Sequence, residues 1–134
     1  MPRISLLGLA FKGVPATDDL RGTMAKPIHA ALAKVFPGAK FRGYDPVVPH
    51  ELARSFFGIE IAQSLSEAFT GSDMAVIMNN HAAFRAMDIG AFAQGMNRPS
   101  LIYDFWNMFD DVEDRLPQGC HYMALGSERA PVWT

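Results

Sequence analysis

The residues best suited to chemistry lie in one loop near the amino terminus. This loop carries an aromatic ring and two cations, Phe11, Lys12 and Arg21, between the glycines Gly8 and Gly22. A lysine ammonium neutralises a diphosphate as a point charge, and an arginine fork suits bidentate binding to phosphate or carboxylate. These residue types suit an anionic ligand with an apolar part. Taken alone, however, they favour an ordinary solvated loop, since a short motif needs structural context.

The start of the same loop partly matches a dinucleotide fingerprint. Gly8, Ala10 and Gly13 stand where the pattern G-x-G-x-x-G has glycines, with alanine at the position where the backbone must approach a pyrophosphate. An acidic residue, Asp45, closes the expected second strand, but it lies much further along the chain than the roughly 20 residues of that pattern. The fingerprint alone leaves NAD binding in this chain open.

Short apolar runs alternate with helical segments along the whole chain. Strands are expected at 4–10, 40–44, 59–62, 74–78, 101–103 and 120–125, and helices at 23–36, after Pro49, at 64–69 and at 82–96. This alternation predicts a three-layer, Rossmann-like α/β fold, with a parallel sheet of about six strands and helices on both faces. In such sheets ligands bind outside the carboxyl ends of the strands, which is where the first loop lies.

The composition limits the possible functions. With 134 residues, of which 49% are hydrophobic, residues 1–134 are expected to form a single domain. A net charge of -2 without a basic run predicts no nucleic-acid or membrane partner, and the first apolar run is too short for a signal peptide or a membrane span. The single cysteine, Cys120, fits a reducing cytoplasm, and the spacing of His29, His50 and His121 predicts no metal site.

Several motifs together resemble the C-terminal domain of the UDP-glucose and GDP-mannose dehydrogenase family. They are Gly-Leu-Ala-Phe-Lys at 8–12, Thr-Asp-Asp-Leu-Arg at 17–21, Tyr-Asp-Pro at 44–46, Asn-Asn-His at 79–81 followed by Phe84, and Asp104-x-x-Asn107. The resemblance covers nearly the whole chain. It implies a C-terminal part of a longer enzyme that oxidises the C6 hydroxyl of a nucleotide sugar to a carboxylate for polysaccharide precursors.

The resemblance also implies a division of labour. In the family, two NAD-dependent steps pass through a thioester on a cysteine, and both that cysteine and the cofactor domain lie in N-terminal portions that this chain does not contain. Phe11 and Lys12 match residues that bind the nucleotide sugar, for which a UDP-sugar is expected, and Arg21 matches an arginine that reaches toward NAD. No catalytic residue is expected here. The implied partners are the N-terminal dehydrogenase domains and, in the full enzyme, further copies.

Two departures from the family pattern predict a subfamily with altered phosphate or sugar contacts. The loop at 11–21 is two residues longer than the commoner form, and Trp106 stands where the family usually has a ligand-binding arginine. Trp106, Met108 and Phe109 could together form an exposed apolar patch that packs against the absent domains.

The remaining polar residues have structural interpretations. Asp18 and Asp19 are expected to cap the first helix, and one of them could orient Arg21 by an ion pair. His81 is expected to cap or to be merely exposed, and Cys120 to be inert in a buried strand. Two other functions stay open: a free-standing nucleotide-binding or regulatory module, and an interaction protein of the same fold without a small ligand.

Overall fold

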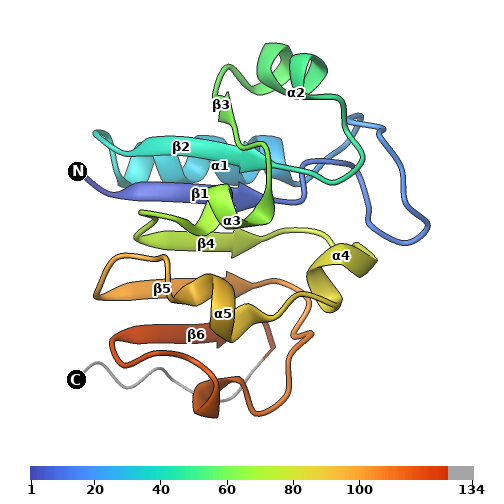
Figure 1. Ribbon diagram of the computed structural model, residues 1–134. Coiled ribbons are helices and arrows are strands. Elements are labelled where there is room, and N and C mark those ends of the chain that lie inside the picture. Colours follow the sequence, from blue (N-terminus) through green and yellow to red (C-terminus); the bar gives the residue numbers. More distant parts are fainter. Residues whose placement is uncertain (127–134) are drawn as a thin grey trace.

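A parallel sheet of six strands forms the centre of the molecule (Figure 1). The computed structural model describes residues 1–126. The strands lie in the order β3-β2-β1-β4-β5-β6. Their bounds are Arg3–Leu7 for β1, Lys40–Tyr44 for β2, Glu60–Ile61 for β3, Met74–Ile77 for β4, Ser100–Asp104 for β5 and Cys120–Ala124 for β6. The chain runs outward from β1 to β3, returns to place β4 beside β1, and then runs outward in the other direction. The switch point of the topology therefore lies between β1 and β4.

Helices lie on both faces of the sheet, which confirms the predicted three-layer architecture. Figure 1 shows α1 behind the sheet and α3 and α5 in front of it. Their bounds are Ala25–Val35 for α1, His50–Phe57 for α2, Leu65–Phe69 for α3, Ala82–Arg85 for α4 and Ile89–Ala93 for α5, with a 3₁₀ turn η1 at Val112–Asp114. Within residues 1–126, no helix is long and apolar enough to cross a membrane.

Alternating side chains of β1 divide the core into two clusters. Ile4 and Leu6 pack into the cluster beneath α1, while Leu7 belongs to the cluster beneath α3, α4 and α5. All three side chains are almost fully buried because β1 is a central strand with both faces covered. This central position fixes the carboxyl end of β1, from which the first loop leaves the sheet.

The predicted helix at 82–96 is wrong in its extent. It is divided into α4 and α5, and Asp88 caps the second piece by accepting a hydrogen bond from the backbone N–H of Ala91 at 3.2 Å. Gly90 packs so closely against the carbonyl of Arg115 that a Cβ there would lie 2.5 Å from that oxygen. The break places the short α5 against the loop that precedes β6.

Candidate functional site

The first loop is fixed at its far end by Thr23. Its hydroxyl donates a hydrogen bond to the carbonyl of Leu9 at 2.7 Å and accepts one from the backbone N–H of Ala25 at 3.2 Å. The N-cap residue of α1 is Met24, whose side chain forms no capping hydrogen bond, and no acidic residue lies in the first turn, so the prediction that Asp18 and Asp19 cap this helix is wrong. The reason is that the loop folds back on itself, which brings Thr23 rather than the aspartates to the first free N–H group of the helix.

The buried carboxylate of Asp45 holds the beginning of the loop. One oxygen accepts hydrogen bonds from the backbone N–H groups of Leu9 and Ala10 at 2.8 and 2.9 Å, and the other accepts from Val47 and Val48 at 2.8 and 3.1 Å. Asp45 is only 4% exposed. A dinucleotide pyrophosphate needs free backbone N–H groups at this turn. Two of them are already occupied, so the turn does not act as an ordinary dinucleotide cradle.

The crevice at the switch point is closed by contacts between two loops. The loop after β1 and the loop after β4 meet at glycines, where a Cβ on Gly13 would lie 2.0 Å from the backbone nitrogen of His81. A Cβ on Gly8 would likewise lie 2.7 Å from Cγ of Asn79, and Gly8 has a φ of 91°. A ligand at this end of the sheet must therefore lie over the loops rather than between the strands.

All three predicted site residues are exposed on the first loop. Phe11 is 48% exposed, its ring lies against Gly22, and the ammonium of Lys12 lies 5.7 Å from the centroid of that ring. The backbone N–H of Phe11 donates to the carbonyl of Asp19 at 2.6 Å, which closes the loop. Phe11 and Lys12 thus share one solvent-facing surface, and Arg21 lies at the far end of the same closed loop.

Arg21 is oriented by Asp19, as one interpretation of the sequence predicted. Nε and Nη2 of the guanidinium donate to the two carboxylate oxygens, each at 3.0 Å. These bonds lower the pKa of Asp19 and raise the pKa of Arg21, so both groups stay charged at neutral pH. The Thr17 hydroxyl accepts the N–H of Asp19 at 3.1 Å, and the Arg21 side chain remains 91% exposed. The pair leaves Nη1 outside the bidentate contact.

His81 has the capping role that was preferred from the sequence. Its Nδ1 accepts a hydrogen bond from the backbone N–H of Ala83 at 2.9 Å, at the start of α4. The buried Asn79 accepts the N–H of His81 at 3.2 Å, so the amide and the imidazole together shape the loop after β4.

Asp104 organises the loop after β5, a role that was not anticipated from the sequence. Its fully buried carboxylate accepts hydrogen bonds from the N–H groups of Trp106 and Met108, each at 2.8 Å, and from the Tyr122 hydroxyl at 2.7 Å. The predicted apolar patch is wrong, because Phe109 is buried and Met108 packs against the core. Trp106 alone of the three is exposed. The feature of the sequence that could have indicated this role is the position of Asp104, an acidic residue directly after the predicted strand at 101–103.

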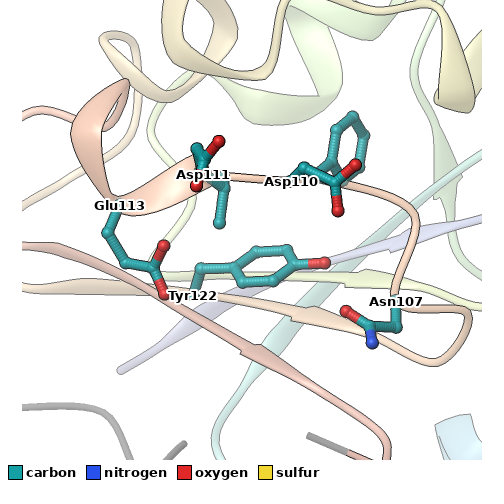
Figure 2. A pocket seen from close by; sticks show the side chains of 7 residues that line it. Asn107, Asp110, Asp111, Glu113 and Tyr122 are labelled. Atoms are coloured by element: carbon teal, nitrogen blue, oxygen red, sulfur yellow. The ribbon is translucent and has the colours of Figure 1, made fainter.

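A polar pocket of about 450 Å³ lies between the chain that follows β5 and Tyr122 of β6 (Figure 2). The Tyr122 ring forms its floor, Asp110 and Asp111 lie on the loop above it, and Glu113 and Asn107 lie at its two ends. Burial and Asp104 raise the pKa of Tyr122, so its hydroxyl stays protonated. Its three carboxylates oppose the binding of a diphosphate, so this pocket does not suit the anionic part of a nucleotide. Residues 1–126 contain no group of three or more His, Cys, Asp or Glu side chains that could hold a metal ion.

Cys120 lies in β6 and is buried. Burial raises the pKa of its thiol, which opposes formation of the nucleophilic thiolate. The prediction that this cysteine is inert agrees with its surroundings. It is the one cysteine of the sequence, so no thiolate chemistry is available from another residue of this chain.

Comparisons with known proteins point to one family. The model of the UDP-glucose/GDP-mannose dehydrogenase family, UDP binding domain, matches residues 5–111. A UDP-glucose 6-dehydrogenase of Bacillus subtilis, YwqF, is 33% identical over 124 residues, which are 92% of this chain and 27% of the relative. A UDP-glucose 6-dehydrogenase of Gallus gallus is 30% identical over 127 residues, covering 85% of this chain and 25% of the relative.

A solved structure supports the same fold. An NDP-N-acetyl-D-galactosaminuronic acid dehydrogenase from Methanosarcina mazei superposes with a TM-score of 0.76 at 24% identity, covering 95% of this chain and 25% of that one. The chain thus spans about a quarter of the length of these three relatives. Because the family model covers most of the sequence, the chain belongs to the UDP-glucose/GDP-mannose dehydrogenase family, and the matched part is its UDP-binding domain.

Proposed function

We propose that this chain is the nucleotide-sugar-binding domain of an NAD-dependent nucleotide-sugar 6-dehydrogenase. The whole enzyme would oxidise the C6 hydroxyl of a UDP-sugar to a carboxylate, and this domain would hold the nucleotide while the reactive groups come from N-terminal domains. The proposal rests on one observation: an exposed aromatic ring with a lysine ammonium beside it, and an exposed arginine, belong to one loop at the carboxyl edge of the sheet. Positioning of this kind supplies much of the rate enhancement of such enzymes.

The chemistry of the loop supports this assignment residue by residue. Lys12 would neutralise the diphosphate, because its ammonium carries no ion pair within 4.0 Å among the described residues. Phe11 would pack against the ligand with its half-exposed ring. Arg21 would offer the part of its guanidinium outside the Asp19 contact to a phosphate of the cofactor.

NAD does not fit this domain's own crevice. The N–H groups of Leu9 and Ala10 are bonded to Asp45, and the loops after β1 and β4 touch at Gly13. NAD would supply hydride acceptance on an N-terminal domain, with Arg21 as the contribution of this chain. The proposed partners are therefore those domains, within a homo-oligomer of the longer enzyme.

Calorimetric titration of the purified chain with UDP tests the proposal. Lys12→Ala is expected to weaken binding by about 1–3 kcal/mol, because a hydrogen bond between charged groups is lost. Lys34→Ala, at the other end of α1, is the matched control and should leave the affinity unchanged. An unchanged affinity of Lys12→Ala would remove Lys12 from the site. The absence of heat with UDP and with GDP would favour an interaction protein without a small ligand.

A further inference from the structure

Trp106 has an indole ring that is both exposed and fixed. The ring nitrogen donates a hydrogen bond to the carbonyl of Met78 at 3.2 Å, and the backbone N–H donates to Asp104 at 2.8 Å. The following residue, Asn107, has a φ of 50°, which ends the turn in the left-handed region. Trp106 is nevertheless 48% exposed. The indole N–H and the backbone N–H of this residue are thus both hydrogen-bonded, while about half of the residue is exposed to solvent. Such a ring is preorganised to stack against another flat group.

The indole stands beside the switch point of the sheet. Met78, whose carbonyl accepts the indole N–H, donates its own N–H to Leu7 of β1 at 2.8 Å. The next residue, Asn79, lies directly against Gly8, where the first loop begins. Trp106 therefore flanks the closed crevice from the β5 side, and the loop of Phe11 and Lys12 rises from the β1 side. A ligand that spans the crevice would contact both.

The β1 side and the β5 side of the closed crevice carry opposite charges. The β1 side offers the cations Lys12 and Arg21, whereas the loop that follows Trp106 carries the exposed carboxylates of Asp110 and Asp111. A diphosphate is attracted to the first side and repelled from the second. The part of the ligand over Trp106 must be uncharged, and a flat unsaturated ring stacks best on an indole.

We infer that Trp106 is the stacking platform for the nucleotide base, with the diphosphate directed toward Lys12. This inference rests on the proposed function and adds the orientation of the ligand across the crevice. Trp106 becomes a residue that determines base affinity, while Lys12 determines affinity for the diphosphate.

A comparison of the affinities for UDP and for inorganic pyrophosphate separates the contribution of the base from that of the diphosphate. The wild-type chain is expected to bind UDP about tenfold or more tightly than pyrophosphate, since stacking of one base on an aromatic side chain contributes that much. Trp106→Ala should remove this preference and leave pyrophosphate affinity unchanged. Trp106→Phe should keep most of the preference, and Lys12→Ala should weaken both ligands. Circular dichroism establishes that each variant is folded.

Fluorescence gives a second readout. The sequence contains two tryptophans, so Trp133→Phe leaves Trp106 as the only indole emitter. UDP should quench this emission and pyrophosphate should not. If the wild-type chain binds both ligands but Trp106→Ala keeps the preference for UDP, the inference is wrong and the proposed function stands. If the wild-type chain binds neither ligand, the proposed function fails, and the inference fails with it.

Discussion

Asp45, which follows β2, and Asp104, the last residue of β5, are buried carboxylates that both accept hydrogen bonds from loop backbone. Between them they accept hydrogen bonds from six N–H groups and one hydroxyl, four at Asp45 and three at Asp104. The position of Asp45 at a strand end was recognisable from the sequence, but its partners Leu9 and Ala10 lie 36 and 35 residues away. Only the folded chain shows that the acid binds the loop rather than a ribose.

Replacing Asp45 by alanine tests this role. Asp45→Ala is expected to lower the free energy of unfolding by about 2–4 kcal/mol, because buried N–H groups lose a charged acceptor. The control is Asp88→Ala, which removes the exposed cap of α5 and is expected to lower the free energy of unfolding by about 1 kcal/mol. Urea denaturation measures both. Equal losses in the two variants would contradict the view that Asp45 holds the loop.

The buried thiol of Cys120 gives a prediction about reactivity and pH. Because burial raises its pKa, the native chain holds less thiolate than the unfolded chain at any pH below the folded pKa. Native protein should therefore react slowly with a disulfide reagent at pH 7, and unfolded protein quickly. The neutral thiol contributes stability below its ordinary pKa of 9.0, and this contribution is lost as the pH rises through the folded value. Rapid labelling of native protein would show that Cys120 is accessible.

At the scale of elements, apolar runs predicted all six strands, and β2 has the predicted bounds. The expected strand at 4–10 instead ends at Leu7, because Gly8 adopts a left-handed conformation and Asp45 takes the next N–H groups. The helix predicted at 82–96 failed for a tertiary reason, since Gly90 packs against a carbonyl of a distant loop. The pattern of apolar residues within one segment of the sequence does not predict contacts with a distant segment.

The contact between the loops after β1 and β4 predicts an effect of Gly13→Ala. The added methyl group would lie 2.0 Å from the His81 backbone nitrogen, so the two loops must separate. We expect a loss of about 1–3 kcal/mol in unfolding free energy and weaker UDP binding. Gly38→Ala is the control, because its added methyl group meets only the flexible Met1 side chain at 3.0 Å. Identical melting temperatures of the two variants would show that the loops are not in contact.

At the scale of the whole molecule, the parallel pairing of the strands places the loops after β1, β2, β4 and β5 at the carboxyl edge of one sheet. The resemblance of its motifs to a known family singled out the loop of Phe11, Lys12 and Arg21, whose residues lie close together in the sequence. It did not locate the acidic pocket of Figure 2, which is assembled from the β5 loop and a side chain of β6. The two candidate surfaces differ in charge, and this difference favours the first loop for a diphosphate.

Nuclear magnetic resonance of the isotopically labelled chain distinguishes these surfaces directly. On addition of UDP, we expect the largest amide shifts at Phe11, Lys12 and Arg21, together with a shift of the Trp106 indole N–H. Shifts centred instead on the pocket residues Asn107, Asp110 and Tyr122, with the first loop unchanged, would contradict the account.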